Sequence, residues 1–242
     1  MLRFSGKETM KKIAAVLLVF VAIAGGALFW LSGNLDGLVK DALENYGSAM
    51  TQAKVSVGAV KIAAADGKGT ISNLSIGNPA GFKTPHALKV GRIDVEIDIA
   101  SVTRDVIVIR SIAVVAPDVV YEKGAAMTNF DAIQKNIAAY LGPADSKKDG
   151  KKLIVEQLTI RGAKAEASAG FMNGKTVSVP LPDITLKNIG RAKGGVTAGE
   201  LGQEVAGAVK AKLTSVVSFD HLMHSTGEAI GKAGTAIKGL FK

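Results

Sequence analysis

The chain has 242 residues, a formal net charge of +9 and no cysteine. Without cysteine, disulfides, thiol chemistry and thiolate metal sites are excluded. Part of the positive charge belongs to a short N-terminal tail and only 5% of the residues are aromatic, so the sequence lacks the dense basic and stacking surface of a nucleic-acid-binding protein.

The first element is an uninterrupted apolar run over residues 13–31, which follows a basic tail over residues 1–12. Nineteen helical residues rise roughly 28 Å, close to the roughly 30 Å hydrocarbon core of a bilayer. The basic tail predicts a cytoplasmic N-terminus and a translocated remainder. A cleaved signal peptide is the alternative, because Ala22 and Ala24 are spaced as at a cleavage site. The run continues past them to Phe29 and Trp30, which favours a retained signal anchor.

An amphipathic helix is expected near residues 35–52. Its apolar positions recur at the helical period, and polar residues occupy the opposite side. We expect this helix to pack on a sheet and to cover one end of it, rather than to lie on the membrane. The apolar positions of this covering face are Leu35, Leu38, Val39, Leu43 and Tyr46.

From Val55 the pattern changes to the period of two that is typical of strands, with a hairpin turn at 66–69. The clearest strand spans 92–99, where charged residues alternate with Ile93, Val95, Ile97 and Ile99. This alternation predicts a half-buried antiparallel strand. The next strand, 106–115, is more continuously apolar and includes Val106 and Val108. It is expected at the sheet centre and is predicted to continue past Pro117.

A second helix is predicted over 128–141, with Thr128 as its N-cap, followed by a charged loop. After the loop, the apolar spacing of residues 109–121 returns 46 residues later at 155–167. The repetition suggests a sheet that grows by similar β units. Two short strands are expected near 177–179 and 184–189.

The C-terminal segment, 197–242, is predicted to form amphipathic helices, beginning with a capping box at Thr197 and Glu200. Its last part contains several glycines, so its order should depend on a surface that it binds. We expect the membrane-facing or partner-facing side to comprise Ile230, Ile237, Leu240 and Phe241.

Motifs for catalysis are missing from the sequence: there is no phosphate-binding glycine motif, nucleophile elbow or zinc-helix signature. His221 and His224 have helical spacing, but the only third ligand nearby is Glu228, and Gly227 weakens that turn. Asp94, Glu96 and Asp98 have the period of a strand's solvent face rather than of a cation site. We therefore expect no catalytic, cofactor-binding or metal-binding residues and a protein that is not an enzyme.

Three motifs within residues 10–122 carry a resemblance: Ile71-x-Asn73-Leu74-x-Ile76-x-Asn78-Pro79-x-Gly81-Phe82, Leu88-x-Val90-Gly91-x-Ile93 and the Ser101-Val102 turn before an apolar strand. With them, residues 10–122 resemble the N-terminal module of the AsmA-like proteins of Gram-negative bacteria, and are similar to the chorein module of bridge-like lipid-transfer proteins. This similarity implies a single-pass inner-membrane protein whose bulk is periplasmic and whose curved antiparallel sheet binds phospholipid or other acyl lipids. The resemblance implies no catalytic residues, because the AsmA-like family has none.

The expected fold is thus α+β: a transmembrane helix, a curved, groove-like antiparallel sheet within 33–190, amphipathic helices at its ends and a helical C-terminus. The groove candidates are Ile93, Val95, Ile97, Ile99, Val106 and Val108. Partners would be the lipid, the inner membrane and other envelope proteins or a second copy. The alternative is an envelope scaffold with a closed core that binds partners through its C-terminal helices.

Overall fold

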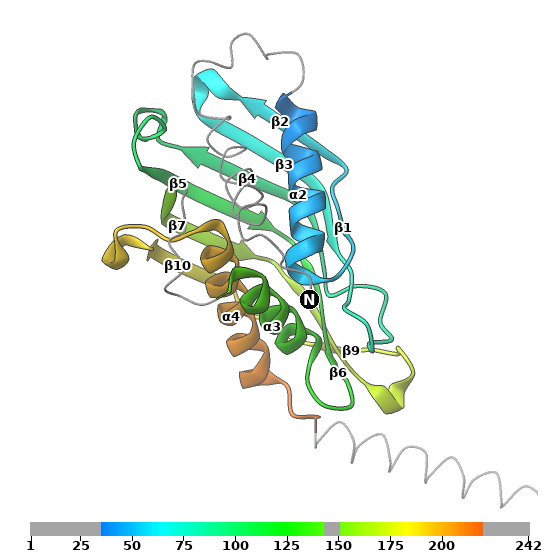
Figure 1. The fold of residues 1–242 in the computed structure, drawn as a ribbon. Helices are drawn as coiled ribbons and strands as arrows, with labels where there is room; N and C mark the ends of the chain where they lie inside the picture. The colour runs from blue at the N-terminus through cyan, green and yellow to red at the C-terminus, as the bar shows by residue number, and fades with distance from the viewer. Residues whose placement is uncertain (1–34, 143–150, 220–242) are drawn as a thin grey trace, which may run out of the picture.

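The computed structural model describes residues 35–142 and 151–219 and has an open β-sheet with helices on one face (Figure 1). The helices are α2 (Leu35–Thr51), α3 (Asn129–Leu141) and α4 (Ala198–Val216). The expected α+β class is confirmed. Within the described residues no helix is long and apolar enough to cross a membrane. The predicted anchor at 13–31 and the face formed by Ile230, Ile237, Leu240 and Phe241 lie outside the described residues.

Among the described residues the sheet has ten strands: β1 (Val55–Ser56), β2 (Ala59–Ala63), β3 (Lys68–Ile76), β4 (Leu88–Ile97), β5 (Val106–Val115), β6 (Asp118–Lys123), β7 (Lys152–Arg161), β8 (Lys164–Ala169), β9 (Val177–Val179) and β10 (Ile184–Ile189). One side of β4 pairs with β3, which in turn pairs with β1 and β2. The other side of β4 pairs with β5 and β6, beyond which lie β7 and β8, and then β10 and β9.

The sheet is mixed, which corrects the antiparallel prediction. β5 pairs with β7 in parallel, and β6 pairs with β8 in parallel. Parallel neighbours need a long crossover connection, and α3 lies within it. The 46-residue repeat is the register of this pairing: Ile109 pairs with Val155 and Tyr121 pairs with Ala167.

An interruption between β5 and β6 keeps apolar side chains on one face of the sheet. Successive side chains alternate between faces, so Val114 and Val119 would point oppositely in a regular strand. Ala116, with a φ of 46°, and the buried Pro117 break the alternation, and both valines join the same apolar cluster. Gly162, with a φ of 63°, has the same place between β7 and β8. The predicted continuation of the chain past Pro117 is confirmed, and no extra residue is inserted there, because Arg92 with Val115 and Leu88 with Val119 keep one register with β4.

The described residues form one large apolar cluster and two smaller ones, the third of which joins Met50 of α2 to Ile133 and Ile137 of α3. In the main cluster, Val209 and Leu213 of α4 and Phe130 of α3 pack on β5 to β10. In the second cluster, Val39 of α2 packs on Val57 and Val60. The N-cap predicted at Thr128 and the capping box predicted at Thr197 are both present. Thr128 forms a capping box as well, with Asp131 as its reciprocal partner, as Glu200 is for Thr197.

Helix α2 also closes one edge of the sheet. An exposed edge presents unpaired backbone donors to other chains, and native proteins block such edges. Here three backbone N–H groups of the edge donate to α2 side chains: Val55 to Ser48 Oγ at 3.0 Å, Val57 to Glu44 Oε1 at 2.7 Å and Ile62 to Asp36 Oδ1 at 3.0 Å. The amphipathic helix therefore lies along an edge of the sheet, not across one end of it.

An ion pair between Asp131 of α3 and Lys210 of α4 gives the fold a pH dependence. Burial raises the pKa of Asp131, but hydrogen bonds from Lys210 and Thr128 outweigh burial and hold that pKa below its usual value. The pKa of Asp131 is thus lower in the folded chain than in the unfolded chain, where it is about 3.9. The ionised carboxylate therefore stabilises the fold at pH values above about 3.9, and this stabilisation is lost as the pH falls through the pKa of the folded state.

We therefore expect Asp131→Asn to lower the free energy of unfolding by about 0.5–1 kcal/mol at neutral pH, since the pair is partly exposed. The difference from wild type should disappear near pH 2, and urea unfolding at both pH values measures it. A difference that persists at the acidic pH would show that the ionised carboxylate is not its origin.

Candidate functional site

The most distinctive surface of the helix-bearing face is a row of half-buried aliphatic residues, here called the apolar strip. Ile71 of β3 pairs with Ile93 of β4, which also pairs with Val114 of β5. One step along, Val95 pairs with Ile112. The apolar strip consists of Ile71, Leu74, Ile93, Val95, Ile112 and Val114, and each of these residues is half-buried.

The apolar strip lies between the main cluster and the second cluster. Ile71 and Leu74 border the second cluster, whereas Val95, Ile112 and Val114 border the main one. Ile93 belongs to neither cluster. The principal sheet contacts of the helices explain this, because α2 contacts β1 and β2, α3 contacts β6, and α4 contacts β7 and β10. In the part of the chain that the structure describes, none of the three α-helices makes a principal contact with β3, β4 or β5.

The six predicted groove residues do not form one surface. Ile93 and Val95 are in the apolar strip. Ile97 shares their face but is only 7% exposed and is part of the main cluster. Ile99 is 47% exposed and begins a short 3₁₀ helix, Ile99–Ser101, beyond the end of β4.

Val106 and Val108 are on the wrong face for the predicted groove. They alternate with Ile107 and Ile109, which are each 1% exposed in the main cluster. Because neighbouring side chains of a strand point to opposite faces, the two valines face away from the apolar strip. Ile112 and Val114 take their place on the face that carries Ile93.

The predicted covering face of α2 is correct at its centre and wrong at one position. Val39 is buried and Leu43 is half-buried against the second cluster. Leu35 and Tyr46 are half-buried. Leu38 is 45% exposed and does not cover the sheet.

The opposite face of the sheet is charged. Arg92 Nε lies 2.8 Å from Asp94 Oδ2, and Arg110 lies near both Glu96 and Asp98. The hydrogen bond from Arg92 is the main reason that the pKa of Asp94 is lowered. These three carboxylates therefore form ion pairs on a solvent-facing surface, as their period of two predicted.

A buried polar network near the β3–β4 loop was not predicted from the sequence. The carboxylate of Glu122, 1% exposed, accepts hydrogen bonds from the backbone N–H groups of Lys83 and Thr84, both at 2.8 Å, and from Thr84 Oγ1 at 2.6 Å. Asn129 Nδ2 donates to Asn78 Oδ1 at 2.9 Å, and its own Oδ1 accepts from Glu122 N–H. The network attaches the loop that contains the Asn78-Pro79 motif to β6 and α3.

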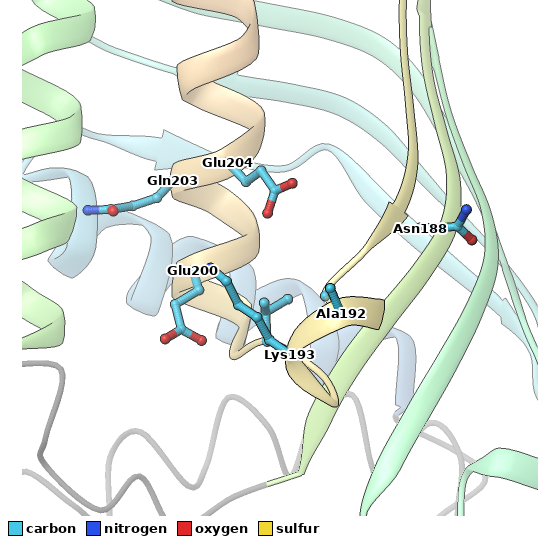
Figure 2. Close-up of a pocket in the computed structure, with 8 residues that line it drawn as sticks. Asn188, Ala192, Lys193, Glu200, Gln203 and Glu204 are labelled. Carbon is cyan, nitrogen blue, oxygen red and sulfur yellow. The ribbon is translucent and has the colours of Figure 1, made fainter.

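A pocket of about 540 Å³ lies between α4 and the turn after β10 (Figure 2). Figure 2 shows Glu200, Gln203 and Glu204 on α4, Lys193 on the turn and Asn188 on the far side. Glu200 Oε2 accepts from Thr197 N–H in the helix cap. The described residues contain no cluster of three metal-binding side chains, and no apolar-strip residue lines this pocket.

The apolar side of α4 packs against the sheet. Leu213 is fully buried and Val209 is 8% exposed, both against the sheet. The alternative scaffold hypothesis would therefore depend on the outer side of α4 or on residues 220–242, which lie outside the described part.

Comparison of the chain with protein-family models, curated protein sequences and solved structures finds no match.

Proposed function

We propose that the protein is a non-enzymatic lipid-binding protein of the bacterial envelope, and that its apolar strip binds phospholipid acyl chains. It would be held in the inner membrane by residues 13–31, with its cytoplasmic tail preceding them and its bulk in the periplasm. It would act in envelope lipid transport or outer-membrane homeostasis. The observation that carries the proposal is the row of half-buried aliphatic side chains on three neighbouring strands.

The chemistry of the apolar strip suits an acyl chain. Its six side chains are aliphatic and offer no hydrogen-bonding group, so a polar ligand would lose its bonds to water without replacement. Strands lie about 4.8 Å apart, so the strip is roughly 10 Å wide. Each methylene transferred from water to such a surface contributes about 0.8 kcal/mol, so a few methylenes are enough for measurable binding.

Photo-crosslinking tests the location of the lipid with two adjacent residues of β5. Val114 is in the apolar strip, whereas Val115 is 48% exposed on the charged face. A photoreactive amino acid at position 114 of the full chain, expressed in a bacterial inner membrane, should give a phospholipid adduct detectable by mass spectrometry. The same amino acid at 115 should not. Equal adducts at both positions, or none at 114, would contradict lipid binding at the apolar strip.

A further inference from the structure

Three loops at one end of the sheet form a surface that is both basic and apolar. This loop tip consists of residues 81–85 between β3 and β4, residues 123–128 from the end of β6 onward, and residues 170–177 from the end of β8 to the start of β9. It contains three lysines, two phenylalanines and two methionines, and no aspartate or glutamate. The opposite end, around 64–67 and 98–105, has charges of both signs, with Asp66, Asp98, Arg104 and Asp105.

The loop tip is one packed unit. Lys83 Nζ donates to the carbonyl of Gly170 at 3.0 Å and to Asn173 Oδ1 at 2.7 Å, which joins the first loop to the third. The second loop lies against the first, because a Cβ added to Gly124 would be 3.0 Å from the ring of Phe82. The loops therefore present their side chains together.

Apolar side chains of the loop tip are exposed beside its lysines. Phe171 is 46% exposed and Val177 is 37% exposed. Lys83 and Lys175 are also exposed. Exposed aromatic and aliphatic side chains beside lysines are what binding at an anionic membrane interface requires. The two carboxylates that hydrogen-bond to the loop tip are not available to repel a membrane, because Glu122 is buried and Asp131 forms an ion pair with Lys210. An isolated apolar residue needs no explanation, but this combination of charge and apolar surface does.

The position of the loop tip in the fold adds to this argument. The hydrogen bond from Ile62 N–H to Asp36 places the start of α2 beside the β2–β3 turn. β6 and β8 run away from that end and terminate at the loop tip. The loop tip is thus at the end of the sheet opposite the start of α2 (Figure 1).

We propose that the loop tip docks on an anionic lipid bilayer, with Phe171 and Val177 inserted at the interface and the lysines among the headgroups. The inference does not depend on lipid binding at the apolar strip. A chain held in one membrane through the segment before α2 would present this second membrane contact at the far end of its sheet.

The test uses the absence of cysteine from the chain. The full chain is placed in nanodiscs of phosphatidylcholine, with an environment-sensitive fluorophore on Phe171→Cys. The matched control is Ile99→Cys, because Ile99 is 47% exposed at the opposite end. Vesicles of equal parts phosphatidylcholine and phosphatidylglycerol should shift the emission at 171 to the blue and leave the emission at 99 unchanged. Lys175→Gln should raise the vesicle concentration for half-maximal response about fivefold.

An unchanged emission at 171 with anionic vesicles at low ionic strength would overturn the proposal. An equal response to vesicles of phosphatidylcholine alone, or an equal response at 99, would also overturn it, because neither would reflect an anionic bilayer at the loop tip. A blue shift at 171 that appears only on adding an envelope protein would identify a protein partner instead.

Discussion

Replacing Glu122 by alanine should lower the free energy of unfolding by about 3–5 kcal/mol. The change removes the carboxylate that accepts three hydrogen bonds. Three donors lose this acceptor: the N–H groups of Lys83 and Thr84 and the Thr84 hydroxyl. Unsatisfied buried donors cost about 1–3 kcal/mol each, and relaxation of the loop recovers part of that cost. Glu122→Gln should lower the free energy of unfolding by less, about 2 kcal/mol. The oxygen of the new amide still accepts a hydrogen bond, but its NH₂ group faces a donor of the β3–β4 loop and cannot accept from it.

Urea unfolding of the full chain in neutral detergent measures both variants. The matched control is Glu166→Ala, since the side chain of Glu166 in β8 is half-buried and forms no hydrogen bond or ion pair with the described residues. That control should stay within about 0.5 kcal/mol of wild type. If Glu122→Ala behaves like the control, then the network does not hold the β3–β4 loop.

Replacing Ile93 by aspartate should weaken binding of acyl lipid at least about 30-fold, which corresponds to roughly 2 kcal/mol. Ile93 is at the centre of the apolar strip, so a carboxylate there would have to lose water when a lipid binds. Because Ile93 is half-buried and joins neither cluster, the variant should remain folded, with a stability loss of about 2 kcal/mol or less. Ile97→Asp, in contrast, would place a charge in the main cluster and is expected to unfold the chain.

The matched control is Val115→Asp. It makes the same kind of change one strand away, on the opposite face, at a position that pairs with Arg92 and Arg161. Its aspartate remains in water and faces two arginines, so both lipid binding and stability should stay close to wild type. Equal loss of lipid in the two variants would contradict lipid binding at the apolar strip.

Local features of the sequence predicted the helices well. Thr128 with Asp131 and Thr197 with Glu200 are capping patterns that depend on residues three apart, and both formed. The alternation around Ile93 gave the correct face for β4. The 46-residue repeat carried the register of β5 with β7, and the helix between the two repeats was the signal for a parallel crossover.

The remaining features depend on contacts between distant residues. Val106 to Ile109 is apolar at every position, so no period of two shows which of its side chains face the helices. Ile97 and Ile93 look alike in sequence, and contacts with distant residues decide that Ile97 is buried in the main cluster whereas Ile93 is half-buried and outside it. The bonds from Lys83 and Thr84 to Glu122 span 39 and 38 residues and leave no local pattern.

Native mass spectrometry of the full chain tests most directly whether the apolar strip holds lipid. After the detergent is stripped, wild type should retain at least one phospholipid, Val115→Asp should retain the same amount and Ile93→Asp should lose it. A wild-type chain that is free of lipid, or an Ile93→Asp chain that retains as much lipid as wild type, would contradict the account.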